Sequence, residues 1–381
     1  MTRSIYREEH NIFRSTFRKY VQKEVVPYLD EWEEREEIPR SAWRRLGELG
    51  FLCPWVDEKY GGSGAGFEYS VIITEELVRA GAYGWPVGHH SDIIAPYIDT
   101  YGTEEQKARW LPGCTSGNII LAIAMTEPSS GSDLQVIQTE AIKKGDSYVI
   151  NGQKTFITNG ICCDLVIVAC KTDPDARPAH KGISLLGVEA ETPGFTKNRK
   201  LTKMGCKSSD TAELFFDDCR VRRENLIGEE NKGFIYMMKK LQQERLIASI
   251  LFQAAAEAML EETVSYSKER KAFGRPIGQL QHNTFKIVEM ATDVELGRTF
   301  LNDLILNHMD GKDVVKEVSM AKWWIAEMAN RVAYHCVQLF GGYGYMEEYR
   351  ICRWYRDIRM ASFIGGTTEI MKVIIGKMMG F

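Results

Sequence analysis

The sequence lacks the patterns that would assign it to several specialised classes of protein. Its 48 lysines and arginines are outnumbered by 52 aspartates and glutamates, which leaves a formal net charge of −4. No positive excess therefore supports binding to nucleic acid or to an anionic membrane surface. No apolar run approaches the roughly 18 to 20 residues that a membrane span needs, and the charged stretch 1–10 lacks the apolar core of a secretion signal. We expect a cytoplasmic protein, or one of an organelle matrix if a transit peptide has been removed.

Disulfide and metal-binding patterns are missing as well. The nine cysteines are scattered, with one adjacent pair, Cys162 and Cys163, and no CxxC spacing. The seven histidines show no HExxH spacing. An odd number of cysteines in a chain of this length argues against a disulfide framework. We predict reduced, mostly buried thiols and no metal site.

The period of the apolar residues divides the chain into three segments. Residues 5–120 predict helices, among them 6–28, 41–50 and 68–79. The stretch 119–222 instead contains an apolar run followed by short strand-like runs at 147–151, 155–158, 165–169, 183–188 and 212–216. Turn signals such as Asn151-Gly152 and Asn159-Gly160 separate these runs. From residue 233 onward four long amphipathic helices are predicted, at 234–270, 284–308, 314–340 and 368–379.

The expected fold is therefore mainly α with a central β domain (α+β). An N-terminal helical domain over 1–120 precedes a middle antiparallel β domain over 121–228 and a C-terminal four-helix bundle over 229–381. The chain contains no internal repeat and no low-complexity linker. We expect the three domains to pack as one body.

Glu244 is the charged member of an otherwise apolar helical stripe. The stripe steps by three or four residues and consists of Met237, Leu241, Glu244, Ala248, Leu251 and Ala255. If that face is buried, desolvation raises the pKa of the carboxyl, which suits a general base near neutral pH. An ion pair with Arg245 or another arginine is the alternative, because ion pairs also account for buried carboxylates. The spacing alone leaves both interpretations open.

Four other stretches could bind a ligand, although each also has an ordinary structural explanation. Residues 126–133 form a loop rich in hydroxyls and glycine that could offer donors to a flat ring or a phosphate. Residues 156–158 could bring an aromatic face to the same ligand, although Phe156 could equally be a core residue. Residues 365–369 open the last helix, where an anion or a simple Thr cap would fit. Residues 338–344 end a long helix with more glycine than a C-cap needs.

In combination and in this order, the motifs resemble those of the acyl-CoA dehydrogenase family over nearly the whole chain. The resemblance rests on 124–128 with 131–133, 151–154 with 157–160, 210–216, 270–274 with Gln281, 338–344 and 365–367. It implies a non-covalent FAD and the α,β-dehydrogenation of an acyl-CoA thioester to a trans-2-enoyl-CoA. It also implies a homotetramer whose FAD sites are completed by a neighbouring subunit, and an electron-transfer flavoprotein as electron acceptor.

The resemblance further implies the position of the catalytic base. Many members carry a Glu directly before the Gly-Thr that opens the last helix, and that position is Gly365 here. Long-chain and isovaleryl-type members instead carry a Glu before Arg-Leu on the first helix of the bundle, and Glu244 matches that alternative. The prediction is therefore that Glu244 is the base and that the substrate is a long or medium acyl chain, with the last helix closer to long-chain members.

By similarity, the flavin ring is expected to contact Ile123, Met125, Thr126, Gly131, Ser132, Phe156, Ile157 and Thr158. The diphosphate and adenosine side is expected to contact Arg270, Phe273 and Gln281, with Gln338, Leu339, Phe340, Gly341 and Gly342 reaching across a subunit contact. Thr367, Thr368 and Glu369 would close over the cofactor, and the backbone N–H of Glu369 would bond the thioester oxygen. The expected substrate contacts are Ser132, Gln242, Gln243, Glu244, Arg245, Gly365 and Gly366.

Three alternatives remain open at the level of the sequence. The same fold could serve a flavin-dependent oxidase or monooxygenase, or a scaffold that binds acyl-CoA without catalysis. A dehydrogenase could also act on an aromatic, alicyclic or dicarboxylic acyl-CoA.

Overall fold

The computed structural model describes residues 5–381, so the first four residues of the charged N-terminal stretch lie outside it. The N-terminal helices are α1 (Glu8–Glu24), α2 (Leu29–Arg35), α3 (Arg40–Glu48), α4 (Phe67–Arg79), α5 (Ala95–Tyr101) and α6 (Glu104–Ser116). The helix predicted over 6–28 ends at Glu24, because Pro27 interrupts it with a short 3-10 turn, Val26–Tyr28. A π-helical turn, His89–Ile94, leads into α5.

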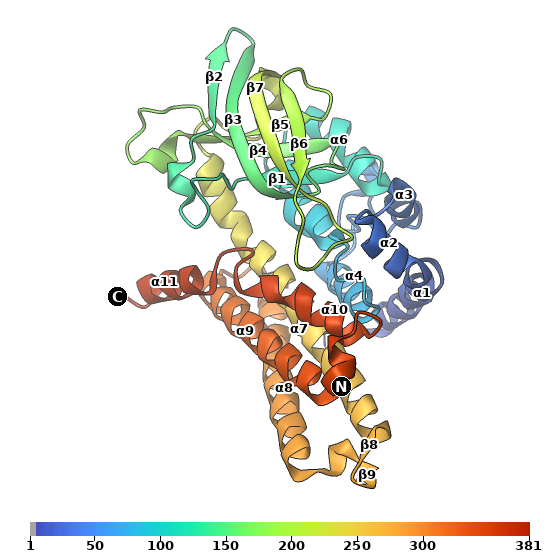
Figure 1. The fold of residues 1–381 in the computed structure, drawn as a ribbon. Coiled ribbons are helices and arrows are strands. Elements are labelled where there is room, and N and C mark those ends of the chain that lie inside the picture. Colours follow the sequence, from blue (N-terminus) through green and yellow to red (C-terminus); the bar gives the residue numbers. More distant parts are fainter. Residues whose placement is uncertain (1–4) are drawn as a thin grey trace.

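The middle domain is one seven-stranded sheet (Figure 1). Its strands are β1 (Leu121–Ala124), β2 (Glu140–Lys144), β3 (Ser147–Thr158), β4 (Leu165–Lys171), β5 (Ile183–Glu189), β6 (Phe195–Lys200) and β7 (Thr211–Arg222). They follow the order β1-β4-β2-β3-β7-β6, with β5 also paired to β4. The sheet is mixed rather than wholly antiparallel, because β1 pairs with β4 in parallel, with Leu121 opposite Leu165. Apolar periodicity identifies strands but carries no information about their direction.

Two details of the predicted sheet are wrong for local reasons. Asn151-Gly152 is not a hairpin turn but a bulge within β3, where the register with β7 shifts between Ile150 and Gly152. Gly152 is needed there because a Cβ on it would lie 2.6 Å from the Oγ1 of Thr139. Strands β2 and β6 were not predicted, because polar or charged residues fill most of their positions.

The C-terminal domain contains the four predicted long helices. They are α7 (Gly233–Glu269), α8 (Gln281–Met309), α9 (Val315–Phe340) and α11 (Thr368–Met378). A small hairpin of β8 (Lys271–Ala272) and β9 (Arg275–Pro276) joins α7 to α8, and a short helix that was not predicted, α10 (Arg350–Ile358), packs on α9. The predicted fold class is confirmed: helical, β and helical domains follow one another along the chain.

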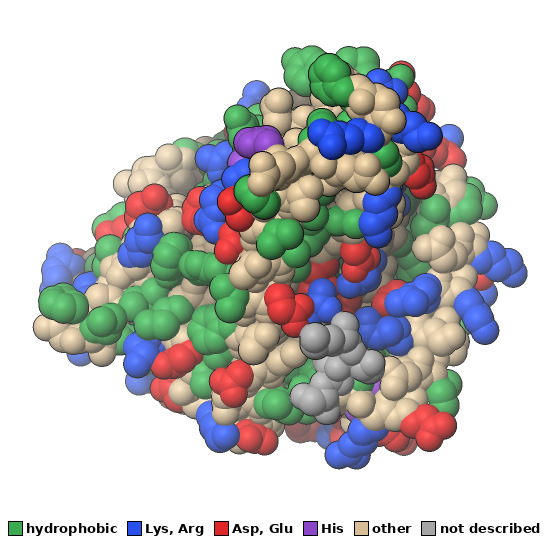
Figure 2. Space-filling model, turned by 90° about the horizontal axis from the view of Figure 1, so that it is seen from below, with side chains coloured by type: hydrophobic (Ala, Val, Ile, Leu, Met, Phe, Trp, Pro, Cys, Tyr) green, Lys and Arg blue, Asp and Glu red, His purple; other side chains and the backbone are tan. Residues whose placement is uncertain are grey.

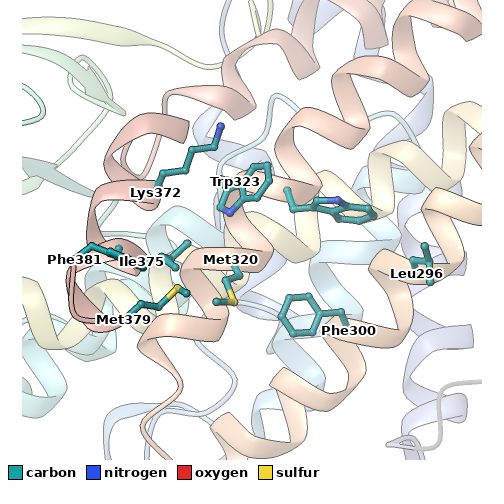
Figure 3. A pocket seen from close by; sticks show the side chains of 10 residues that line it. Leu296, Phe300, Met320, Trp323, Lys372, Ile375, Met379 and Phe381 are labelled. Atoms are coloured by element: carbon teal, nitrogen blue, oxygen red, sulfur yellow. The ribbon is translucent and has the colours of Figure 1, made fainter.

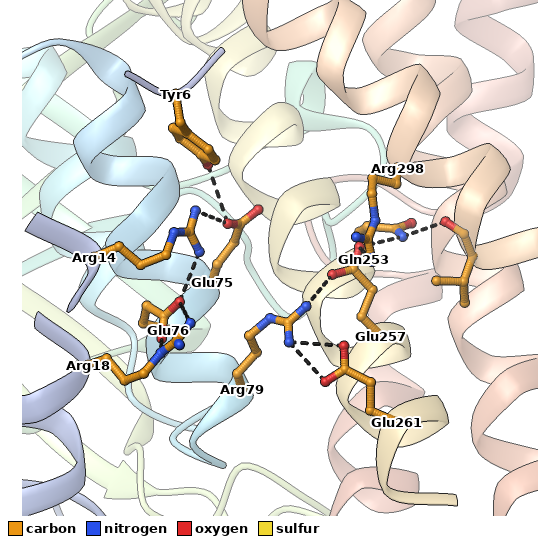
Figure 4. Close-up of polar contacts among 11 residues, drawn as sticks. Tyr6, Arg14, Arg18, Glu75, Glu76, Arg79, Gln253, Glu257, Glu261 and Arg298 are labelled. Carbon is orange, nitrogen blue, oxygen red and sulfur yellow. Dashed lines mark hydrogen bonds and ion pairs between the residues drawn. The ribbon is translucent and has the colours of Figure 1, made fainter. Parts of the chain in front are cut away.

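The N-terminal helices and the bundle are joined by apolar packing and by ion pairs. Val71 and Val78 of α4 share one buried cluster with Ile247 and Ile250 of α7. Beside this cluster, Arg79 of α4 contacts carboxylates on α7, and the arginines of α1 contact carboxylates on α4 (Figure 4). α7 therefore belongs at once to the bundle and to the contact with the N-terminal domain.

The cysteines and the helices agree with the simple expectations from composition. All nine cysteines are free; seven are buried and two are half-buried, which confirms the predicted reduced thiols. Among the helices of residues 5–381, none has both the length and the apolar character that a bilayer span requires.

Candidate active site

Glu244 lies in the first half of α7, with one of its two carboxylate oxygens shielded from water. Its Oε2 atom is buried and has no hydrogen-bond partner among the described residues. The stripe on which it lies is less buried than predicted: Met237 and Ala255 are buried, whereas Leu241, Glu244, Ala248 and Leu251 are half-buried. Helical spacing defines a face but not what covers that face. A partner-free carboxylate on a half-covered apolar face leaves room for a ligand.

The charges around Glu244 act in opposite directions on its pKa. Burial raises the pKa of the carboxyl above its ordinary value, and the cations Arg245 and Lys322 lower it. Arg245 forms no ion pair with Glu244; it is buried against α9, where its guanidinium donates a long hydrogen bond of 3.4 Å to Ser319 Oγ. Within residues 5–381 the geometry thus favours a carboxyl tuned toward neutral pH over the alternative of an ion pair.

The glycine pair before α11 faces this carboxylate. A Cβ built on Gly365 would lie 4.0 Å from Oε1 of Glu244, and one on Gly366 would lie 4.0 Å from a guanidinium nitrogen of Arg245. Both glycines have positive φ, +62° and +99°, a conformation that glycine adopts without steric cost. The two sequence positions at which the family places its base are therefore neighbours in space.

The entry to α11 carries unused backbone donors. The N–H groups of Gly365 and Gly366 have no acceptor among residues 5–381. Thr367 caps the helix, since its hydroxyl accepts the N–H of Ile370 at 3.2 Å, and the buried Thr368 donates to Glu327 at 2.6 Å. Glu369 is exposed, and its own N–H together with the Thr367 hydroxyl lowers the pKa of its carboxyl. The glycine pair therefore offers two N–H groups without an acceptor among the described residues, next to the position at which a Gly365 Cβ would adjoin Glu244.

The loop after β1 is fixed to β3 by a buried ion pair that sequence reasoning missed. Lys154 of β3 is wholly buried and donates to Glu127 Oε1 and to the carbonyl of Met125, both at 2.9 Å. The N–H of Thr155 also donates to the carbonyl of Thr126 at 3.0 Å. A lysine in a strand whose side chains alternate between the core and the solvent would be expected to face the solvent. The burial of Lys154 is explained by its contact with Glu127, which lies 27 residues earlier in the chain.

An exposed aromatic ring lies beside this loop. Phe156 is 68% exposed and has φ of +59°, so it is not the core residue that the alternative interpretation suggested. A left-handed, exposed aromatic residue is strained and often marks a binding site. Ser132 and Gly131 are exposed on the loop, Ile123, Met125, Thr126 and Thr158 are half-buried, and Ile157 is buried. The hydrogen bonds from Lys154 and Thr155 to Met125 and Thr126 place the loop after β1 beside the end of β3 that carries Phe156.

The remaining predicted cofactor residues form a separate group at the far end of the bundle. The Arg270 guanidinium lies 5.4 Å from the ring centre of Tyr343, and Phe340 stacks on Tyr266 at 4.0 Å. Phe273, in the β8–β9 connection, is 92% exposed. Gln281, the first residue of α8, is exposed as well. At the end of α9, Gln338, Gly341 and Gly342 are exposed and Leu339 is half-buried. In Figure 1 the β8–β9 hairpin lies at the opposite end of the molecule from the sheet. One chain does not bring these residues to the loop after β1.

Two predicted substrate contacts are used elsewhere. Gln242 bonds His308 at 3.2 Å and accepts the N–H of Val314 at 3.0 Å, and Gln243 donates to the carbonyl of Asp92 at 2.7 Å. Sequence reasoning also missed Tyr97 of α5, whose buried hydroxyl lacks a partner among residues 5–381. Burial and the charge of Glu244 raise the pKa of that tyrosine. No periodic signal marks it, because Tyr97 lies in an ordinary apolar stretch.

Comparison with known proteins gives matches along almost the full chain. Family profiles described as acyl-CoA dehydrogenase N-terminal, middle and C-terminal domain match residues 7–118, 122–219 and 231–380. The long-chain specific mitochondrial acyl-CoA dehydrogenase of Rattus norvegicus is 46% identical over 376 residues, covering 98% of this chain and 87% of that protein.

Solved structures give the same match in three dimensions. An acyl-CoA dehydrogenase from Geobacillus kaustophilus superposes with a TM-score of 0.99 at 58% identity and covers 100% of both chains. A glutaryl-CoA dehydrogenase from Mycobacterium smegmatis in complex with FADH2 superposes with a TM-score of 0.91 at 27% identity, covering 98% of this chain and 95% of that one.

Proposed function

Since this chain belongs to the acyl-CoA dehydrogenase family of FAD-dependent oxidoreductases, we propose that it converts a long or medium acyl-CoA to the trans-2-enoyl-CoA with Glu244 as the base. The observation that carries this proposal is the buried, partner-free carboxylate opposite a glycine pair with unused N–H groups. Acyl-CoA dehydrogenation is the chemistry of the family; the base and the acyl chain are our inference.

The residues beside β3 fit a flavin. The exposed, strained ring of Phe156 and the braced loop at 125–133 offer an aromatic face, hydroxyls and N–H groups on one side of the sheet. Thr126, Ser132 and Thr158 would hold the flavin ring beside β3. Thr367, Thr368 and Glu369, at the start of α11, would close over the cofactor from the helical bundle. Bound FAD supplies the acceptor for the hydrogen that leaves the β-carbon with its electron pair.

The chain's own groups carry out the proton transfer. Glu244 accepts the α-proton as the α C–H bond breaks and the double bond forms. Negative charge then develops on the thioester oxygen, and backbone donors preorganised near it lower the barrier. We assign these donors to Gly365 and Gly366 ahead of Glu369, because their N–H groups have no acceptor among the described residues, whereas that of Glu369 bonds its own carboxylate, and because the Cβ position of Gly365 adjoins Glu244. Arg245 ties α7 to α9 through its hydrogen bond to Ser319, and its charge lowers the pKa of the base.

A panel of acyl-CoAs tests the proposed function. The FAD-loaded protein is mixed anaerobically with straight-chain, branched, aromatic, alicyclic and dicarboxylic acyl-CoAs, and loss of the flavin absorbance is recorded. We expect the largest and fastest loss with long or medium straight chains. Loss with only the aromatic, alicyclic or dicarboxylic substrates would contradict the proposed chain, and no loss with any would contradict the function.

Two further measurements separate the rival functions. Slow re-oxidation of the reduced enzyme by air, with fast re-oxidation by an electron-transfer flavoprotein, is expected of a dehydrogenase; fast re-oxidation by oxygen would indicate an oxidase or monooxygenase. A protein that stays colourless after incubation with FAD would indicate a scaffold.

The free thiols suit a reducing compartment such as the cytoplasm or an organelle matrix.

We also propose a homotetramer with FAD sites shared between subunits. Around α8, α9 and α11 an apolar pocket of about 650 Å³ opens at the surface, lined by residues such as Phe300, Trp323 and Phe381 (Figure 3). Figure 2 shows apolar side chains gathered on this side of the molecule, and an exposed apolar patch of this kind commonly marks a protein contact. A neighbouring chain would also bring the separate group around Arg270 and Gly341 to the flavin. Light scattering of the purified protein tests the stoichiometry.

The domain boundaries proposed for this function are 1–120, 121–228 and 229–381. They are supported by the connections: α6 ends at Ser116 before β1 starts at Leu121, and a turn at Arg223–Asn225 precedes α7 at Gly233.

Moving the base tests the shared geometry. The Glu244→Gly enzyme should be nearly inactive. Adding Gly365→Glu should raise its rate by about tenfold or more, because the Cβ of the new glutamate would lie 4.0 Å from the position of the original carboxylate oxygen. Full recovery is not expected, since a glutamate at a φ of +62° is strained by about 1 kcal/mol. Turnover of the flavin with a good substrate is the measurement, and recovery below twofold would count against the shared geometry.

A further inference from the structure

A buried lysine on α9, Lys322, is hydrogen-bonded to the Gly365–Gly366 turn that faces Glu244. Lys322 of α9 has no exposed surface, and its ammonium donates to the carbonyl of Gly366. Gly366 follows Gly365, the residue whose Cβ position adjoins the Glu244 carboxylate. Lys322 therefore bonds directly to one of the two residues proposed as oxyanion donors.

The ammonium has no carboxylate bonded to it. Among residues 5–381, Lys322 forms no ion pair, and its one hydrogen bond goes to the glycine carbonyl. The charged groups that face it are Arg245 and Glu244 from α7, Glu327 from α9 and Glu369 from α11. Glu327 is occupied by the Thr368 hydroxyl at 2.6 Å, and Glu369 is exposed. Burying a cation without a bonded counterion costs several kcal/mol, so packing alone does not account for a lysine here.

We propose that Lys322 is a positioning residue for the reaction: it holds the Gly365–Gly366 turn opposite Glu244. The inference rests on the proposed function. Holding the carbonyl of Gly366 fixes the peptide unit that follows Gly366, and through it restrains the two preceding units, whose N–H groups would meet the thioester oxygen. Misplacement of such groups by about 1 Å can cost roughly 10²-fold in rate.

The electrostatics agree with this geometry. Burial and the neighbouring Arg245 lower the pKa of Lys322 to about 8, so the side chain is still mainly protonated at pH 7. Its positive charge lowers the pKa of Glu244, against the effect of burial. Removing that charge should therefore raise the pKa of the base, and a higher pH would be needed to ionise it.

The test compares Lys322→Met with Lys203→Met in the FAD-loaded protein. Lys203 serves as the control: it is half-buried, burial lowers its pKa, and it braces another turn through Ser209 and Thr211, both at 3.0 Å. For Lys322→Met we expect kcat to fall about 10- to 100-fold with KM changed less than about threefold. We also expect a shift in the acid limb of the plot of kcat against pH, which is the region where kcat falls because Glu244 becomes protonated. This limb should move to higher pH by about one unit.

Hydrogen exchange supplies a readout that does not depend on activity. In Lys322→Met the amides of residues 363–371 should exchange faster than in the unaltered protein, while those of β3 stay unchanged. Lys203→Met should alter neither these amides nor the acid limb. Lys322→Arg, which keeps charge and donor, should return the limb toward its original position.

The outcomes distinguish the two levels of the inference. If the unaltered enzyme is active but Lys322→Met leaves either the acid limb or the exchange of 363–371 unmoved, the positioning role is overturned. If the unaltered enzyme reacts with no acyl-CoA, the proposed function itself fails. Should Lys322→Met not fold with FAD, Lys322→Gln keeps a donor without the charge; its acid limb should still move to higher pH, and an unmoved limb overturns the inference.

Discussion

Replacing Glu244 by Gln is expected to lower the rate of flavin reduction by about 10²–10⁴-fold while leaving FAD bound. Gln has nearly the same size and occupies the same position opposite Gly365, but it cannot accept the α-proton. Anaerobic stopped-flow reduction with a saturating acyl-CoA measures this step, and the flavin absorbance of the purified variant measures cofactor retention. Because burial raises the pKa of Glu244, the rate of the unaltered enzyme should also fall as the pH drops through a value above that of an ordinary glutamate.

Glu262 provides a matched control on the same helix. Burial raises the pKa of its carboxyl too, and it lies 18 residues, or about 27 Å along α7, from Glu244. Five helical turns separate them, so both point in nearly the same direction. Glu262→Gln should change the rate of reduction less than about twofold. A comparable loss in both variants, or a Glu244→Gln enzyme of near-normal rate, would exclude Glu244 as the base.

The second large effect is expected on stability, at Glu257. This buried carboxylate of α7 accepts from Arg79 at 2.9 Å and from Arg298 and Gln253 at 3.0 Å each (Figure 4). Glu257→Ala removes the shared partner of two shielded arginines. Removing one member of a buried network typically costs about 3–5 kcal/mol of unfolding free energy. Urea unfolding of the FAD-loaded protein at fixed concentration, followed by circular dichroism, measures the loss.

Glu261 separates burial from charge in this experiment. It contacts the same Arg79 at 2.9 Å but is 60% exposed. An exposed ion pair contributes about 0–1 kcal/mol, so Glu261→Ala should hardly move the unfolding midpoint. Equal losses at the two positions would show that Arg79, rather than the buried network, governs the contact between α4 and α7.

The sequence predicted helices better than strands in this protein, for a physical reason. Each long helix repeats its apolar stripe over many turns, so α7, α8, α9 and α11 were placed to within a few residues. Strands β2 and β6 bury few side chains, and their charged residues hide the alternation. The parallel pairing of β1 with β4 depends on how the chain crosses the sheet, which no local pattern records.

The residues in and around the candidate site divide in the same way. Glu244 could be singled out from the sequence, because one charged residue interrupts an apolar stripe and because the motifs around it resemble a known family. Lys154, Lys322 and Tyr97 could not, since each depends on a partner or a burial that arises only when distant segments meet.

The amino-acid order alone determined the succession of helical, β and helical domains, the absence of disulfide and metal spacing, and the placing of a carboxylate on an apolar helical face. Tertiary packing alone decided that this carboxylate lies without a bonded partner beside Gly365, and that a buried lysine holds the next carbonyl. The period of apolar residues can be read from residues that are close in sequence. Desolvation and electrostatic coupling of Glu244 depend instead on Lys322 and Gly365, which lie 78 and 121 positions further along the chain.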